Sequence, residues 1–148
     1  MKFKIANREI GSSEDPLIIA EIGINHNGNL DQAIVIADSA IQAGAEVLKH
    51  QTHIPDEEMS LEAHQAIPGN SKHSIYKIIK KCALSEIDEN KLMKYIISKK
   101  KIFISTPFSK AAVDRLVRFK VPAFKIGSGE WNNLELIEYI CKFKKPII

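Results

Sequence analysis

Short apolar runs alternate with amphipathic segments along most of the chain. Four β-favouring runs each end in polar or charged residues, and they cover residues 17–21 (LIIAE), 46–52 (EVLKHQT), 101–107 (KIFISTP) and 123–130 (AFKIGSGE). The unbroken apolar part of the first run predicts a strand buried on both faces, which then meets Glu21. Since a buried carboxylate is costly without a partner, this strand tip is expected to be chemical rather than structural.

Apolar residues at helical spacing separate these runs. They predict helices within residues 30–41, 74–83, 92–97, 112–119 and 134–141. Asn29 and Ser109 stand where the caps of two helices are expected. Either Ser85 or Asp88 is expected to cap the helix that reaches residue 97. Alternation of strand and helix with short returns predicts a parallel sheet.

Polar residues at every strand tip favour a (β/α)8 barrel over a doubly wound sheet, because barrel ligands bind at the carboxyl ends of the strands. A full barrel takes about 250 residues. The chain has 148 residues, which accommodate four βα units and the start of a fifth strand at 146–148. We therefore predict an α/β fold, a truncated TIM (β/α)8-type barrel. Residues 1–15 form an amino-terminal edge segment or ribbon turning near Asn7, and residues 16–148 form the amino-terminal half of the barrel.

The connection between the second strand and the following helical unit is unusually long. Residues 54–70 are polar and are interrupted by Pro55 and by the Pro68-Gly69 pair. Loops of this length in compact domains are usually functional. Because this connection leaves the carboxyl end of a strand, we expect it to act as a lid or to supply a substrate contact.

Composition narrows the function classes. The chain is 45% hydrophobic and 26% charged with a net charge of +3, and its lysines are scattered rather than gathered on one face with aromatic residues. This pattern argues against nucleic acid as a partner. Cys82 and Cys141 form no zinc or redox motif and lie in apolar helical patterns, which predicts buried thiols. No apolar run is long enough to span a membrane, so we expect no membrane partner and a cytoplasmic location.

Strand periodicity sorts the polar residues of the second strand into two sets. Lys49 and Gln51 share a face with Val47, while His50 and Thr52 lie on the other face. If the first set faces the barrel axis, the ammonium and amide groups point into one cavity. A lysine at a strand end often only extends its ammonium to water, so the structural interpretation of each lysine stays open.

The fourth run adds a second group of anion-binding candidates. Lys125 and Ser128 lie beside the backbone amides near Gly127 and Gly129, and with Lys49 they would suit a dianionic phosphate. Glu21 and Glu130 then remain for proton transfer or for binding sugar hydroxyls. Alone, the glycine pattern is weak, and Glu21 also fits a role in capping the following turn.

The five histidines do not predict a metal site. His50 and His53 are three residues apart near a strand end and are expected to diverge. His64 and His73 lie in the long connection. A structural role is therefore the preferred interpretation of all four.

Several motifs in register carry a family resemblance. EIGINHNG, VLKHQTHIPDEEMS, IPGN, SIYKIIKKCAL, ISTPFSKAA and AFKIGSGEWNN occur in this order. From about residue 16 onward they resemble the amino-terminal half of the bacterial sialic acid synthases, the N-acetylneuraminate synthase family. The resemblance implies a TIM barrel that condenses phosphoenolpyruvate with N-acetylmannosamine, giving N-acetylneuraminate and phosphate. For the full-length family it also implies a homodimer and a divalent metal, manganese or magnesium.

The resemblance assigns expected roles to matching positions. The phosphoenolpyruvate-binding residues would be Lys49, Gln51, Thr106, Lys125 and Ser128. The sugar-binding residues would be Asn70, Glu21 and Glu130. Glu130 and Glu21 are also the catalytic candidates, with Glu130 as the acid or base nearest the reacting centre.

The sequence departs from the family at one position and covers only part of it. Trp131 stands beside Glu130 where the family usually has a cysteine. The family's metal-ligating histidines, and an arginine that a carboxy-terminal antifreeze-like domain lends to the partner subunit, would lie beyond Ile148. We therefore expect no metal bound by these residues and no turnover by the segment alone.

Two alternatives stay open. One is a related synthase for legionaminic acid, pseudaminic acid or a spore-coat sugar. The other is a non-catalytic remnant that binds a phosphorylated ligand.

Overall fold

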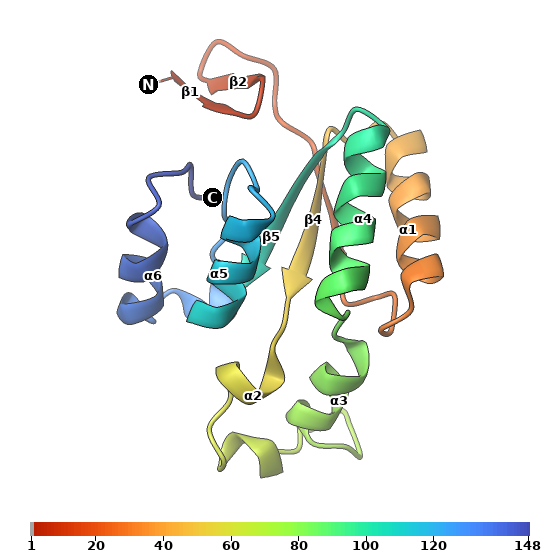
Figure 1. Cartoon of the computed structure of the whole chain (residues 1–148), viewed down its shortest axis with the longest axis vertical. Helices are drawn as coiled ribbons and strands as arrows, with labels where there is room; N and C mark the ends of the chain where they lie inside the picture. The colour runs from red at the N-terminus through yellow and green to blue at the C-terminus, as the bar shows by residue number, and fades with distance from the viewer. Residues whose placement is uncertain (1) are drawn as a thin grey trace.

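The computed structural model describes residues 2–148 as a parallel sheet with helices on one face and a small hairpin at one end (Figure 1). The strands are β1 (Lys2–Ile5), β2 (Arg8–Gly11), β3 (Ile19–Gly23), β4 (Val47–Thr52) and β5 (Ile102–Pro107). The helices are α1 (Leu30–Gln42), α2 (Pro55–Glu58), α3 (Ile75–Cys82), α4 (Glu86–Ser98), α5 (Lys110–Arg118) and α6 (Leu134–Cys141). Two 3-10 turns, η1 (Ala63–Gln65) and η2 (Ser128–Glu130), complete the set.

The sheet runs in chain order, as it does in a (β/α)8 barrel. β3 pairs in parallel with β4, and β4 with β5. The order continues through Phe124, which forms parallel bridges to Ser105 on one side and to Ile147 on the other. The predicted α/β partial barrel is therefore confirmed, including the start of a fifth strand.

The fourth predicted strand, residues 123–128, is shorter than expected. Only Phe124 is bridged, although Lys125 N also donates to Ser105 O at 3.2 Å and Ile126 N to Ile148 O at 2.9 Å. Glycines pair poorly in strands, and here the chain turns into η2 directly after Gly127. The polar tip of this run is consequently a turn rather than a strand end.

The first sheet strand also differs from the prediction. β3 begins at Ile19 rather than at residue 17; within it only Ile22 is buried, Glu21 is exposed and the other residues are partly buried. Ile18, just before it, is 54% exposed. Within residues 2–148, β3 pairs only with β4, which leaves its other edge open. The expectation of a strand buried on both faces is therefore wrong for this chain.

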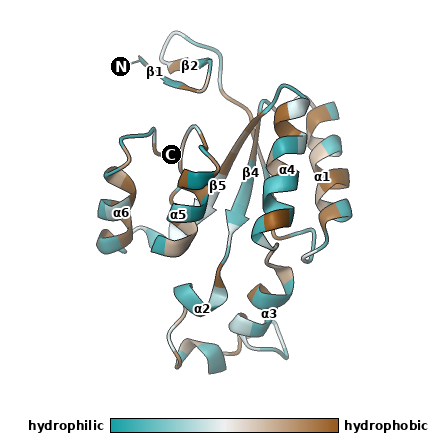
Figure 2. Ribbon diagram, in the orientation of Figure 1, coloured by the Kyte–Doolittle hydropathy of each residue, from teal (hydrophilic) through white to brown (hydrophobic). Residues whose placement is uncertain are grey.

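Two apolar clusters lie on opposite faces of the sheet. On the helix side, Leu48, Phe103 and Phe124 pack against α1, α4, α5 and α6. On the other side, Val47 and Ile104 pack with Ala123 and with Ile5 of the amino-terminal hairpin. In Figure 2, β4 turns teal toward its arrowhead whereas β5 stays brown along most of its length. The cluster of Val47, Ile104, Ala123 and Ile5 therefore lies toward the amino ends of the strands, and the carboxyl ends stay polar.

The ribbon and the helix caps predicted at Asn29 and Ser109 are present in the structure, and Ser74 is a further cap that was not predicted. β1 and β2 pair antiparallel around the two-residue turn Ala6-Asn7. Asn29, Ser74, Ser85 and Ser109 each accept a hydrogen bond from a backbone N–H in the first turn of the helix that follows. Ser85, and not Asp88, caps α4. Of the two cysteines, Cys82 is buried as expected, but Cys141 at the end of α6 is exposed.

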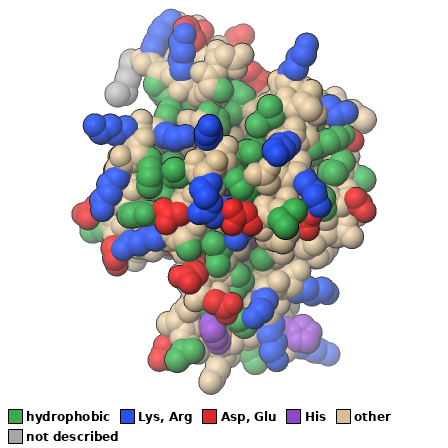
Figure 3. Space-filling model, viewed as in Figure 1, with side chains coloured by type: hydrophobic (Ala, Val, Ile, Leu, Met, Phe, Trp, Pro, Cys, Tyr) green, Lys and Arg blue, Asp and Glu red, His purple; other side chains and the backbone are tan. Residues whose placement is uncertain are grey.

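The surface carries mixed charge. On the face shown in Figure 3, Lys and Arg side chains alternate with Asp and Glu from one end of the molecule to the other. None of the helices in residues 2–148 combines the length and the apolar character that a membrane crossing needs.

Candidate active site

Strand register brings the predicted anion-binding residues of β4 and β5 together. Lys49 and Gln51 lie on the same face of β4 as Val47, which points away from the helices. Gln51 is paired with Thr106 on the adjacent strand, and Lys49 with Glu21 on the strand at the other side. Gln51 lies two residues beyond Lys49, so the four side chains occupy two successive levels at the carboxyl end of the sheet, which together are called the polar layer.

Lys49 is the buried cation of this layer. Its side chain is only 6% exposed, and its ammonium forms an ion pair with Glu21, whose side chain is 60% exposed. The pair satisfies the buried charge, while the exposed carboxylate is free to rotate into water. An anionic ligand entering the layer would therefore meet a preformed ammonium group whose present partner is easily displaced.

Thr106 offers an unused hydrogen bond beside this cation. Its residue is 1% exposed, and its Oγ1 is buried without a hydrogen-bond partner. Gly127 lies against it, since a Cβ at that position would be 3.4 Å from Thr106 Cγ2. A buried hydroxyl without a partner is costly, so this atom has an unused hydrogen bond at the carboxyl end of the sheet.

Lys125 and Ser128 lie on the neighbouring segment. Lys125 shares the inward face of Ala123, and its Nζ donates to Ile126 O at 2.6 Å. Ser128 is exposed at the start of η2. The structure thus places Lys125 beside the layer of Lys49 and Thr106 and places Ser128 at its rim.

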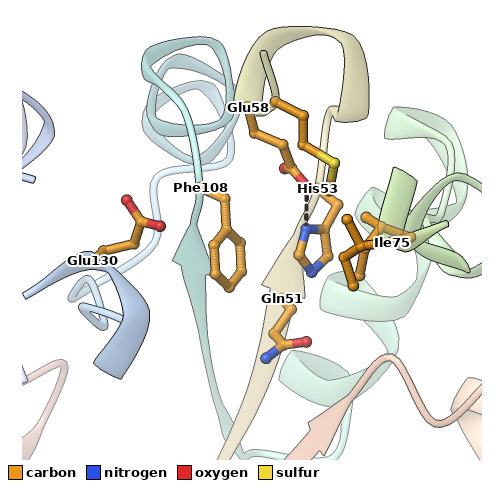
Figure 4. Close-up of a pocket in the computed structure, with 8 residues that line it drawn as sticks. Gln51, His53, Glu58, Ile75, Phe108 and Glu130 are labelled. Atoms are coloured by element: carbon orange, nitrogen blue, oxygen red, sulfur yellow. Dashed lines mark hydrogen bonds and ion pairs between the residues drawn. The ribbon is translucent and has the colours of Figure 1, made fainter. Parts of the chain in front are cut away.

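A cavity of about 310 Å³ opens at the carboxyl ends of β4 and β5 (Figure 4). Its polar lining comes from Gln51, His53, Glu58 and Glu130. Its apolar wall comes from Met59, Ile75, Ile79 and Phe108. Gln51 therefore belongs both to the polar layer and to this cavity, and Glu130 lines the same cavity. Glu130 Oε2 also accepts a hydrogen bond from Asn133 Nδ2 at 2.7 Å.

The remaining predicted residues lie outside this cavity. Asn70 is exposed in the long connection, between η1 and α3, and does not line the cavity. Trp131 is 74% exposed, so the residue that departs from the family pattern points its bulk outward and not against Glu130.

Two titratable residues of the cavity wall, His53 and Glu58, were not expected there from the sequence. His53 Nδ1 lies 2.8 Å from Glu58 Oε1, and both side chains are at least 95% buried. The His53 ring also stacks on Phe108 with a centroid distance of 4.3 Å. The available signal was position alone, because His53 directly follows the strand tip, whereas its pairing with Glu58 depends on the turn that α2 makes.

A buried polar network lies behind β4, on the helix side of the sheet. Gly28 N donates to His26 Nδ1 at 3.1 Å, and His26 Nε2 lies 3.2 Å from His50 Nε2. His50 Nδ1 lies 3.2 Å from Glu89 Oε1. Because Nδ1 of His26 accepts, its Nε2–H donates to His50, and the proton of His50 then faces the carboxylate. The His26 ring is neutral in this arrangement, in keeping with its lowered pKa.

Glu89 is the centre of that network. Arg115 donates to its Oε2 at 3.0 Å, and Thr52 donates to its Oε1. Ser105 Oγ lies 2.7 Å from Thr52 Oγ1 and completes the chain. Burial raises the pKa of Glu89, but the hydrogen bonds and charge of its partners outweigh it and leave the pKa below its ordinary value. Glu89, Met93 and Ile96 fall on one helical stripe, which is the signal that could have placed this carboxylate inside.

We expect acid to destabilise the protein through His26. Burial, and then the neighbouring His50, lowers its pKa from the ordinary 6.5 to about 4. Between these values the unfolded chain binds a proton that the folded chain refuses, so stability is complete above pH 6.5 and falls as the pH drops toward 4. From pH 7 to pH 5 the loss should be about 2 kcal/mol.

Urea unfolding at pH 7, 6 and 5 measures this loss. His26→Gln should be less stable at pH 7 yet lose less stability on acidification, because the titrating ring is absent. Parallel curves for the two proteins would contradict the assignment.

Residues 2–148 contain no group of three or more His, Cys, Asp or Glu side chains that could hold a metal ion. The divalent metal that the resemblance implies therefore has no site built from the described residues alone.

Comparison with known proteins identifies the family of this chain. Residues 9–148 match the NeuB family. The spore coat polysaccharide biosynthesis protein SpsE of Bacillus subtilis is 35% identical, over 99% of this chain and 39% of its own length. The N,N'-diacetyllegionaminic acid synthase of Legionella pneumophila is 34% identical, over 93% of this chain and 40% of its own. The chain thus spans about two fifths of the length of the curated relatives it matches.

A solved structure supports the same fold. The N-acetylneuraminic acid synthetase of Leptospira borgpetersenii, crystallised with citrate, superposes with a TM-score of 0.83 at 24% identity, covering 99% of this chain and 48% of that one. The resemblance drawn from the motifs is confirmed at the level of the family and of its barrel. The chain belongs to the NeuB family.

Proposed function

We propose that this chain carries the substrate-binding wall of a synthase that condenses phosphoenolpyruvate with N-acetylmannosamine to give N-acetylneuraminate and phosphate. The observation that carries the proposal is the polar layer of the buried Lys49 and Thr106 and the partly exposed Gln51, which reaches through Gln51 into a cavity that Glu130 also lines. Such a layer offers cations and hydroxyls to an anion on one side and a carboxylate to a hydroxylated substrate on the other.

In this proposal the phosphate and carboxylate of phosphoenolpyruvate bind to the cationic side. Lys49 leaves Glu21 for the ligand, and Lys125 supplies a second ammonium. Thr106 donates from its unpartnered hydroxyl, and Ser128 closes the rim. Charge-assisted hydrogen bonds of this kind are among the strongest in proteins.

The sugar binds on the side of Glu130, and Glu21 and Asn70 are proposed as further contacts from outside the cavity, since neither lines it. The enol carbon of phosphoenolpyruvate forms a bond to the aldehyde carbon of the open-chain sugar, and the aldehyde oxygen takes a proton. Water adds to the resulting cationic carbon and loses a proton to a base, for which Glu130 is the nearest candidate. The carbon–oxygen bond to phosphate then breaks as the new hydroxyl group gives its proton to the departing phosphate, which releases phosphate and leaves the keto acid.

The identity of the sugar has a specific alternative. Among the relatives, an N,N'-diacetyllegionaminic acid synthase is 34% identical and a pseudaminic acid synthase of Campylobacter jejuni is 32% identical. The methyl group of a second acetamido substituent could pack against the apolar wall of the cavity. The same layer of residues would then serve a diacetamido sugar.

The test is phosphate release by the natural polypeptide that carries this chain, supplied with phosphoenolpyruvate and one sugar at a time. Release with N-acetylmannosamine supports the proposal, and release only with a diacetamido hexose supports the alternative. Protection of the protein by phosphoenolpyruvate against thermal unfolding, lost in Lys125→Ala, without release for any sugar, would identify a non-catalytic binding protein instead. Neither release nor protection would refute both functions.

A further inference from the structure

One ring nitrogen in the cavity wall has no partner. His53 Nε2 is buried and makes no hydrogen bond, although the His53 side chain is 5% exposed and lines the cavity. In Figure 4 this nitrogen points away from Glu58. A buried polar atom without a partner costs free energy, and its position beside Gln51 and Glu130 at a cavity points to a ligand as the missing partner.

Glu58 fixes the proton of this histidine. One carboxylate oxygen faces His53 Nδ1 at 2.8 Å, and the other accepts the backbone N–H of Ile54 at 3.2 Å. A carboxylate that accepts at both oxygens requires the proton to be on Nδ1. In the neutral ring Nε2 is then an acceptor, and stacking on Phe108 holds the ring in this orientation.

The hydrogen bonds of the cavity select the kind of group that can bind there. Glu130 and His53 both offer acceptors, so the occupant must bring donors. The anionic form of phosphoenolpyruvate carries acceptor oxygens only and is better served by Lys49 and Thr106. A hydroxylated chain brings O–H donors, and its carbon atoms can lie on the apolar wall that Ile75 and Ile79 provide.

We propose that His53, oriented by Glu58, is a specificity-determining residue whose Nε2 accepts a hydrogen bond from one hydroxyl group of the open-chain amino sugar. The inference rests on the proposed function and names the contact by which its site recognises the sugar. His53 acts here by binding, and the chemical steps belong to other groups.

The first test compares His53→Phe with His64→Phe in the natural polypeptide. Phenylalanine keeps the stacked ring in both variants, on Phe108 in one and on Tyr76 in the other. His64 is a matched control because its Nε2 is also buried without a partner, yet it does not line the cavity. His53→Phe should raise the KM for the sugar about tenfold or more, with kcat and the KM for phosphoenolpyruvate changed less than about threefold. His64→Phe should leave all three constants close to those of the wild type.

Analogues of N-acetylmannosamine that each lack one hydroxyl locate the contact. One analogue should cost the wild type about tenfold in kcat/KM and cost His53→Phe less than about twofold, because the partner is already gone. Equal penalties in both proteins for every analogue would overturn the inference while leaving the synthase function intact. Absence of phosphate release by the wild type with every sugar would instead refute the proposed function.

Nitrogen-15 NMR of the histidine rings provides a readout without a variant. His53 should show a protonated Nδ1 and a bare Nε2, and the Nε2 resonance should move upfield when N-acetylmannosamine is added in the presence of phosphoenolpyruvate. Glu58→Gln should place the proton on Nε2, since the Gln amide can accept from Ile54 and donate to Nδ1. An unchanged Nε2 resonance at saturating sugar would overturn the inference even if His53→Phe failed to fold.

Discussion

Lys49→Met should weaken phosphoenolpyruvate binding by about 10- to 100-fold, because a hydrogen bond to a charged group contributes about 1.5–3 kcal/mol and 1.4 kcal/mol is tenfold in affinity. The side chain is 6% exposed, so methionine fills its volume with little change in packing. Its partner Glu21 is 60% exposed and remains hydrated when the ammonium is removed. The variant is therefore expected to fold normally and to fail in binding.

The affinity is measured by titration calorimetry with phosphoenolpyruvate, and the free energy of unfolding by urea. Lys101→Met is the matched control, since Lys101 precedes β5 at the opposite end of the sheet. It should bind phosphoenolpyruvate as the wild type does. Equal affinity of the wild type and Lys49→Met would place the anion site elsewhere, and a large loss of stability in Lys49→Met would make the ion pair structural.

The two faces of β4 could be predicted from sequence because they depend on local pattern. Two-residue periodicity in residues 47–52 was enough to separate Lys49 and Gln51 from His50 and Thr52, and the structure has them on opposite faces as predicted. Caps such as Ser109 are equally local, since one side chain accepts from the first turn. These parts of the fold follow from spacing that is visible within a few residues.

Long-range pairing could not be predicted in the same way. The partners His50 and Glu89 are 39 residues apart, and the sequence around either residue does not indicate that the other is its partner. The predicted length of the fourth strand was wrong for a related reason. That length depends on how many backbone hydrogen bonds the neighbouring segments form with a glycine-rich run. For His53 the sequence only argued against a metal ligand and favoured a structural role; its pairing with Glu58 depends on a turn that brings this carboxylate against the ring.

The buried network and the candidate site share a strand, which gives the helix side of the sheet a role in the site. His50 and Thr52 of β4 are held by Glu89, while Lys49 and Gln51 on the same strand face the ligand layer. Alternate residues of one strand cannot move independently. The network therefore fixes the height and direction from which Lys49 and Gln51 enter the site.

Glu89→Ala should destabilise the protein by about 3–5 kcal/mol, the usual cost of breaking a buried ion pair by removing one partner. The change removes the carboxylate that faces Arg115 Nη1 and His50 Nδ1, and the side chains of Arg115 and His50 are both nearly buried. Glu86→Ala, one turn earlier on α4, is the matched control. Glu86 is 45% exposed; it pairs with the exposed Arg118 and lies 3.7 Å from Arg115 Nε, while Arg115 keeps its closer partner Glu89, so the loss of Glu86 should cost less than about 1 kcal/mol.

Urea unfolding at pH 7 measures the free energy of unfolding of both variants. Equal slopes of this free energy against urea concentration show that both variants expose the same amount of surface on unfolding. If Glu89 acts through β4, the folded Glu89→Ala protein should also bind phosphoenolpyruvate more weakly than Glu86→Ala, although neither residue touches the site. A Glu89→Ala protein as stable as Glu86→Ala would show that the network carries no net stability. Full stability loss with unchanged binding would instead separate the network from the orientation of Lys49 and Gln51, and leave the sheet alone to position them.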